Sequence, residues 1–189
     1  MTKGGADKAP KDGIMEPRID HTKTAPDAEA AMMGLERYVH QSGLDRGLIE
    51  LVKLRASLIN GCANCVDMHT KVARSQGETE QRLYSISLWR ETPFYSERER
   101  AALASTEAVS LVNVDHVSDD VYDLARQQFT EKELVDLTLA IVAINGWNRL
   151  AIAFRTVPGT FQLRGRPSIG DAVGVADVEG GALSEGRQA

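Results

Sequence analysis

The chain has 189 residues, enough for one ordinary domain and too few for two, so we expect a single core flanked by tails. Lys and Arg total 22 against 27 Asp and Glu, a formal charge of -5, and the basic residues are dispersed, which argues against a nucleic-acid partner. Hydrophobic residues make up 42% and aromatic residues 5%, a composition typical of helices that pack through aliphatic side chains.

Both ends of the chain lack a sustained hydrophobic period. We expect a flexible N-terminal arm at residues 1–25, a helical domain at 26–160 and a Gly-containing C-terminal tail at 161–189. The first 20 residues contain no apolar run of the kind found in secretory signals or membrane anchors. The sequence therefore favours a cytoplasmic protein.

Helical signals begin where the N-terminal arm ends. Pro26 opens a first predicted helix, which stops near Gly43, and a second helix is expected over residues 45–59. Asn60-Gly61 is a strong turn signal, and a third helix follows from about residue 62 to 76. This pattern places Cys62 at or near a helix N-terminus.

Two capping boxes mark later helix starts. Ser96 with Glu99, and Thr130 with Glu133, have the Ser/Thr-x-x-Glu spacing in which side chain and backbone satisfy each other's hydrogen bonds. Two weaker helices are expected over residues 79–89 and 118–129. Because strand-like alternation is lacking, we predict an all-α fold.

The segment 137–154 is apolar enough to suggest a membrane span, but polar residues fall at its middle, among them Asn145, Asn148 and Arg149. We therefore expect a helix buried within the domain or in a subunit contact, which is a hint of a homo-oligomer.

The two cysteines of the chain belong to a compact motif. Glu50, Cys62, Cys65 and His69 have the spacing E-x11-C-x2-C-x3-H. At roughly 100° per residue, Cys62, Cys65 and His69 fall within an arc of about 60° on one helix face. The spacing predicts one site.

This combination of residues suits thiol redox chemistry. A cysteine in the first turn of a helix is favoured as thiolate, the nucleophilic form. His69 can take the thiol proton and return it to a departing peroxide oxygen, and Glu50 can orient that histidine. The attacked sulfur becomes a sulfenic acid, the neighbouring thiol condenses with it to a disulfide, and an external dithiol must then reduce the pair.

Other interpretations stay open at this point. Cys62, Cys65, His69 and Glu50 could be four zinc ligands, although three of them on one helix make tetrahedral closure awkward. A thioredoxin-like protein would need a strand before its C-x2-C, whereas a helical run precedes this one. A disulfide reductase acting on a partner protein, and a structural oligomer with unused cysteines, are further alternatives.

Several polar and aromatic residues also have a structural interpretation. Glu50 lies at helical spacing with Arg46, Lys53 and Ser57, a row most simply read as a solvated face. Three aromatic residues could line a pocket but are more often core residues: Trp89, Phe94 and Trp147. His40 and His116 have no evident partner, and Asn145 and Asn148 must find hydrogen bonds inside the apolar helix.

The motif and its surroundings resemble the alkylhydroperoxidase D-like members of the carboxymuconolactone decarboxylase superfamily. The likeness spans roughly residues 33–159 and is strongest in the Lys53–Cys62 segment together with Cys65 and His69. It continues in the segments Trp89–Phe94 and Asn145–Arg149.

The resemblance implies an all-helical domain with C-x2-C at a helix N-terminus, assembled into trimers or hexamers, that reduces hydroperoxides or exchanges thiols with disulfides. It assigns Cys65 as the peroxidatic cysteine, Cys62 as the resolving one, and Glu50 with His69 as the proton relay. No bound cofactor is implied, only an external dithiol of the thioredoxin or lipoyl type. Asn64 departs from members that carry a histidine before the second cysteine. The decarboxylase branch generally lacks the cysteine pair, so its lactone chemistry is not expected.

Overall fold

A computed structural model describes residues 15–163, which form helices and no strand. The elements are α1 (His21–Thr24), α2 (Pro26–Gln41), α3 (Arg46–Asn60), α4 (Ala63–Ser75), α5 (Glu80–Ser85), the 3₁₀ helix η2 (Ile86–Glu91), α6 (Glu97–Ser110), α7 (Asp119–Gln128) and α8 (Glu131–Phe154). The predicted all-α class is confirmed, and most predicted helices agree with these bounds to within a few residues.

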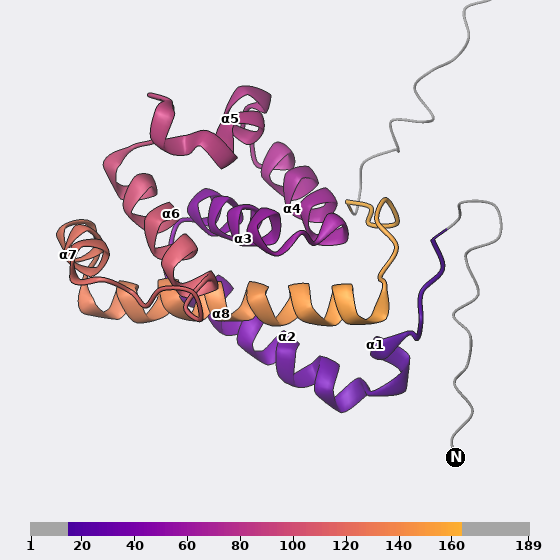
Figure 1. Ribbon diagram of the computed structural model, residues 1–189. Helices are drawn as coiled ribbons and strands as arrows, with labels where there is room; N and C mark the ends of the chain where they lie inside the picture. Colours follow the sequence, from indigo (N-terminus) through magenta and orange to yellow (C-terminus); the bar gives the residue numbers. More distant parts are fainter. Residues whose placement is uncertain (1–14, 164–189) are drawn as a thin grey trace, which may run out of the picture.

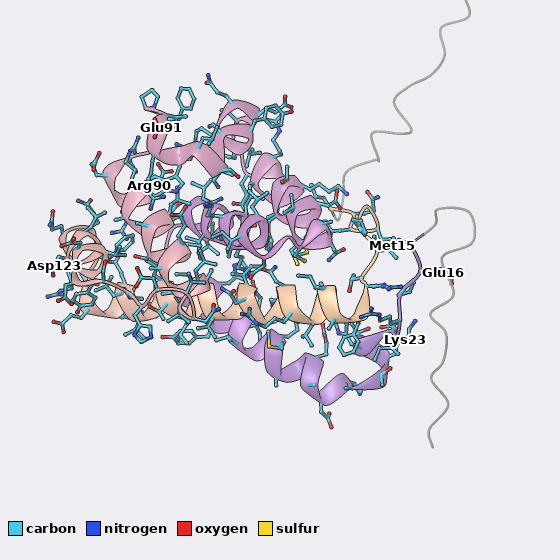
Figure 2. The ribbon with its side chains drawn as sticks, viewed as in Figure 1. Met15, Glu16, Lys23, Arg90, Glu91 and Asp123 are labelled. Atoms are coloured by element: carbon cyan, nitrogen blue, oxygen red, sulfur yellow. The ribbon has the colours of Figure 1, made fainter. Side chains whose placement is uncertain are left out.

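The longest helix, α8, forms the base of the bundle (Figure 1). Helix α2 crosses it on one side, while α3 and α6 pack on the other. Helix α3 contacts α4, α6 and α8, so it lies at the centre of the domain. Charged side chains such as Arg90, Glu91 and Asp123 lie on the outside (Figure 2).

The turn between α3 and α4 determines where the cysteines lie. Gly61 has φ 69° and ψ 30°, a left-handed conformation that glycine adopts without a Cβ penalty. The Cys62 backbone N–H then donates to the Ser57 carbonyl at 2.9 Å, closing the end of α3. Cys62 itself is extended and is the N-cap of α4, as predicted.

The apolar helix α8 begins at the predicted capping box of Thr130 and Glu133, and α6 begins at that of Ser96 and Glu99. By length and composition α8 would be able to span a membrane. It packs instead between α2 and the pair α3 and α6, and its fully buried Asn148 is hydrogen-bonded to α3. These contacts support an interior helix of a folded domain.

Two regions differ from the expected pattern. The single helix expected over 79–89 is a short α-helix followed by a 3₁₀ turn with a kink at Leu88. This change of pitch buries both Ile86 and Trp89, whose indole N–H reaches Glu107 at 2.8 Å.

Part of the expected N-terminal arm has a defined place against the domain. His21–Thr24 forms α1, and Arg18 donates hydrogen bonds to the carbonyls of Phe154 and Ala153 at the end of α8. Residues 1–14 of the arm, and the expected tail beyond residue 163, lie outside the described residues.

The Gly61 turn makes a stability prediction. Gly61→Ala is expected to lower the free energy of unfolding by about 1 kcal/mol, because an L-residue is strained in the left-handed region. Gly34 is a matched control: it lies inside α2, and a Cβ there would meet only Arg37 at 3.8 Å. Gly34→Ala should therefore raise stability by roughly 0.5–1 kcal/mol. Urea unfolding midpoints measure both, and shifts of the same sign would contradict the argument.

Candidate active site

The cysteine pair lies at the start of α4 with both thiols reduced and buried. The sulfur of Cys62 accepts the backbone N–H of Cys65 at 3.4 Å, as an N-cap side chain does. The side chains are 1% and 2% exposed for Cys62 and Cys65, so access to them depends on an adjoining pocket. The predicted proximity of the two cysteines is therefore present in the fold.

The two sulfurs differ in their affinity for a proton. The pKa of Cys62 is lowered to about 7, first because the Cys65 thiol donates to it, and further by the backbone N–H groups of Cys65 and Asn64 and the amide of Asn148; burial opposes the change. The pKa of Cys65 is raised, because its proton is held by Cys62 and because the thiol is buried. The pair therefore shares one proton near neutral pH, with the negative charge mainly on Cys62.

His69 and Glu50 form a buried pair beside the cysteines. The Nδ1 atom of His69 lies 2.8 Å from Oε2 of Glu50, and the two residues are 6% and 3% exposed. When Glu50 is ionised, Nδ1 carries the hydrogen, and Nε2 is left as a proton acceptor. The proposed proximity of Glu50 to His69 is thus present in the fold.

The solvated-face interpretation of the α3 polar row was wrong. Glu50, Lys53 and Ser57 are all buried, at 3%, 2% and 0% exposed, and only Arg46 at the start of the helix is exposed. The row faces α4, α8 and a pocket rather than water, because α3 is enclosed by other helices.

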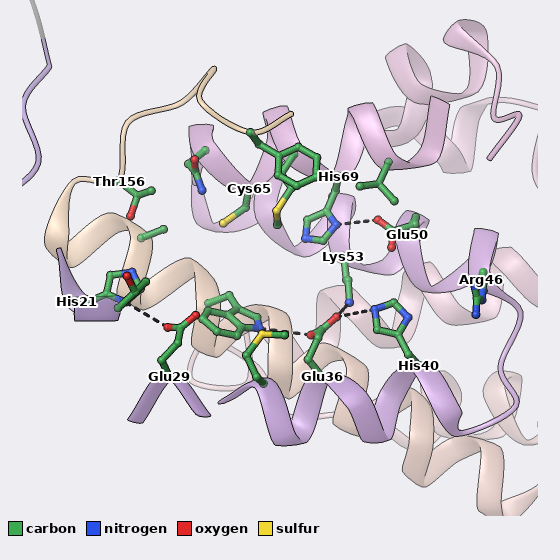
Figure 3. Close-up of a pocket in the computed structure, with 18 of the residues that line it drawn as sticks. His21, Glu29, Glu36, His40, Arg46, Glu50, Lys53, Cys65, His69 and Thr156 are labelled. Atoms are coloured by element: carbon green, nitrogen blue, oxygen red, sulfur yellow. Dashed lines mark hydrogen bonds and ion pairs between the residues drawn. The ribbon is translucent and has the colours of Figure 1, made fainter. Parts of the chain in front are cut away.

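A pocket of about 460 Å³ opens beside the His69–Glu50 pair (Figure 3). Cys65, His69 and Glu50 line it, whereas Cys62 does not. Its apolar lining comes from Met33, Met68, Val72, Trp147, Ala151 and Phe161. A small organic molecule entering the pocket would therefore meet the Cys65 sulfur, with Cys62 behind it.

The opposite wall carries a second polar group, which the sequence analysis missed. Glu36 of α2 pairs with the buried ammonium of Lys53 and with Nε2 of His40 at 3.0 Å, and it accepts the indole N–H of Trp147 at 3.3 Å. Figure 3 shows Lys53 reaching from α3 toward Glu36, across from His69. These contacts lower the pKa of Glu36 although burial works against them.

The aromatic residues and the further histidines that the sequence singled out lie partly in the core, partly at the pocket and partly on the surface. Trp89 belongs to the core and Phe94 packs against it, whereas Trp147 lines the pocket. His40 lines the pocket too, while His116 is exposed.

Segments from both ends of the domain complete the pocket. His21 of α1 lines it, as do Thr156 and Phe161 beyond α8. The Phe161 carbonyl accepts a hydrogen bond from Lys71 at 3.1 Å, and Asp67 accepts the Gly159 N–H at 3.1 Å. The first residues of the expected C-terminal tail are thereby joined to α4.

The zinc interpretation lacks a suitable set of ligands. Within residues 15–163, no three His, Cys, Asp or Glu side chains come together in a group that could hold a metal ion. Oε2 of Glu50 is hydrogen-bonded to Nδ1 of His69, so these two candidate zinc ligands engage each other.

Comparison with known proteins places this site in a family. Residues 26–108 match the model of the carboxymuconolactone decarboxylase family. The uncharacterized protein YdfG of Bacillus subtilis is 45% identical over 139 residues, which are 74% of this chain and 95% of that protein. The chain belongs to the carboxymuconolactone decarboxylase family.

Within the family, the chain is alkylhydroperoxidase D-like. A crystal structure from Agrobacterium tumefaciens, of a protein of unknown function named as a candidate antioxidant defence protein AhpD, has a TM-score of 0.75 at 46% identity; the match covers 77% of this chain and 100% of that one. The crystal structure of the debrominase Bmp8 shares the fold, with a TM-score of 0.67 at 20% identity over 74% of each chain.

The first deprotonation of the cysteine pair in this alkylhydroperoxidase D-like site can be titrated. We expect thiolate absorbance at 240 nm to rise by one thiolate per chain with a midpoint near pH 7, as the lowered pKa of Cys62 requires. Cys65→Ala should move this midpoint upward, because alanine has no side-chain hydrogen to donate to the sulfur of Cys62. Cys62→Ser should abolish the step near pH 7. A wild-type midpoint near the ordinary thiol value would contradict the coupling.

Proposed function

We propose that the protein is a thiol-dependent peroxidase that reduces organic hydroperoxides. The observation that carries this proposal is that Cys65, His69 and Glu50 line one largely apolar pocket, with Cys62 directly behind Cys65. A nucleophile, a base with its orienting group and a second thiol are the parts that such a reaction needs.

In the proposed first step, Cys65 attacks the peroxide. Because Cys65 holds the proton of the pair at rest, it needs a base, and we assign this role to Nε2 of His69, the ring nitrogen that Glu50 does not engage. The sulfur–oxygen bond forms as the O–O bond breaks, and the proton passes from His69 to the departing alkoxide. The products are an alcohol and a sulfenic acid on Cys65.

In the second step, Cys62 displaces the oxygen from Cys65. Its lowered pKa suits this role, since it is already a thiolate near neutral pH. The sulfur–sulfur bond forms as the S–O bond of Cys65 breaks, and the departing hydroxide takes a proton from solvent, which yields water and a disulfide between the two cysteines. An external dithiol of the thioredoxin or lipoyl type then returns both thiols by exchange.

A disulfide reductase that serves a partner protein uses the same two sulfurs and is the second candidate. The pocket favours the peroxidase, because Cys65 lines a largely apolar pocket of small-molecule size and Cys62 is covered. A protein disulfide would have to reach a sulfur that is only 2% exposed.

Free-thiol titration before and after one equivalent of cumene hydroperoxide tests the roles of the two cysteines. The wild type should lose both thiols, Cys62→Ser should accumulate a sulfenic acid, and Cys65→Ser should be inert. The same samples are assayed for zinc. Unreactive thiols together with stoichiometric zinc would reject the peroxidase and favour a metal module.

The proton relay is tested by His69→Gln and Glu50→Gln. His69→Gln should lower the second-order rate with hydroperoxide by about 100-fold or more, the usual contribution of general acid–base catalysis. Glu50→Gln should also lower it, because the histidine tautomer is no longer fixed by a charge. The exposed His116→Gln is the matched control and should react at the wild-type rate. Equal rates in His69→Gln and His116→Gln would exclude the relay.

A further inference from the structure

We propose that Asn148 is a further residue of the redox site, whose side-chain N–H stabilises the negative charge of the Cys62–Cys65 pair. The inference rests on the thiol chemistry proposed above and adds a group to it from α8, a helix that carries no part of the cysteine motif.

The face of α8 that carries Asn148 packs against the cysteines. Ile144 and Ala151, one turn before and one turn after Asn148, form a single buried cluster with Cys62 and Cys65. Asn148 lies between them on the same face and is 0% exposed. Its amide lies beside the two cysteines and lowers the pKa of each thiol.

The orientation of the amide is fixed by its neighbours. Asn60 donates through Nδ2 to Oδ1 of Asn148 at 2.8 Å, and Asn148 donates through Nδ2 to Oγ of Ser57 at 3.1 Å. Ser57 gives its one hydroxyl hydrogen to the Lys53 carbonyl at 2.7 Å, so its oxygen accepts from Asn148. If the Asn148 amide were flipped, its NH₂ group would face the NH₂ group of Asn60, and its oxygen would face the Ser57 oxygen.

This fixed orientation leaves one N–H of Asn148 for the sulfurs. An amide NH₂ group has two hydrogens, and Ser57 takes one of them. The other donors to the pair are neutral as well, namely the backbone N–H groups of Cys65 and Asn64 and the Asn64 side chain. Among residues 15–163, no lysine or arginine donates to either sulfur. Each neutral dipole therefore carries an appreciable share of thiolate stabilisation.

Asn145 supplies a matched control on the same helix. It accepts from the same Asn60 Nδ2, at 2.9 Å, but its own Nδ2 donates to Oγ of Ser110 at 3.0 Å and to the Ile141 carbonyl at 2.8 Å. Both asparagines thus accept a hydrogen bond from the turn residue Asn60. Of the two, Asn148 is the one on the face of α8 that packs against the cysteines. If the hydrogen-bonded amides of Asn60, Asn145 and Asn148 had a purely structural role, replacing Asn145 or Asn148 would have the same effect on thiol ionisation.

The titratable and charged groups of the pocket are identical in these variants. They are His21 on α1, Glu29, Glu36 and His40 on α2, Arg46, Glu50 and Lys53 on α3, and His69 on α4. A change in thiol ionisation that is found in one asparagine variant and not in the other can therefore be attributed to the lost N–H.

The experiment compares Asn148→Ser with Asn145→Ser in the full chain, with both cysteines reduced. Thiolate absorbance at 240 nm is followed against pH. In Asn148→Ser the midpoint should rise by about one pH unit or more, the usual effect of losing a hydrogen bond to a charged group. Asn145→Ser should keep the wild-type midpoint. Equal midpoints in the two variants would overturn the inference.

A second variant covers the case in which Asn148→Ser does not fold. Asn148→Leu has about the same size and carries neither an N–H nor a charge, so the midpoint should again rise; an unchanged midpoint in a folded Asn148→Leu, judged by circular dichroism, would overturn the inference. The titration uses no peroxide. If the wild type proves unreactive with cumene hydroperoxide while Asn148→Ser still shows the raised midpoint, the peroxidase proposal fails and the role of Asn148 stands.

Discussion

The left-handed turn at Gly61 is the constraint on which the site depends. It ends α3 and makes Cys62 the N-cap of α4, so that the backbone N–H groups at the start of α4 point at a sulfur. The same turn folds α4 back against α3, which brings His69 to Glu50 across 19 residues of sequence. Without this reversal the motif would lie along one continuous helix, and Glu50 would not meet His69.

A second constraint is the cost of burying polar groups in a small helical domain. The α3 row is enclosed on several sides, and each of its buried groups has a partner on another element: Glu50 with His69, Lys53 with Glu36, and Ser57 with Asn148. These pairs link α3 to α4, α2 and α8 in turn. The interactions that satisfy the core therefore also form two walls of the pocket.

The sequence was informative wherever the determinant was local. Capping boxes, the Asn-Gly turn and the C-x2-C spacing each act within a few residues, and they predicted helix starts and the position of Cys62 correctly. The wall formed by Glu36 and His40 could not be found in this way, because it depends on α2 crossing α8 at a particular place. Helical spacing alone could not show that α3 is covered on the side of Glu50, and so favoured a solvated face.

The donors around the sulfurs explain how the site can work with Asn64 in place of a second histidine. Asn64 gives its backbone N–H to Cys62 and its side chain to Cys65, and it lines the pocket. Neutral donors stabilise a thiolate without taking up its proton, so in the proposed mechanism the proton of the pair stays on Cys65 until His69 removes it. A histidine at this position would add a second acceptor next to the same thiol. With asparagine there, we propose that proton transfer depends on His69, and that thiolate stability depends on the amides at the start of α4 and on Asn148.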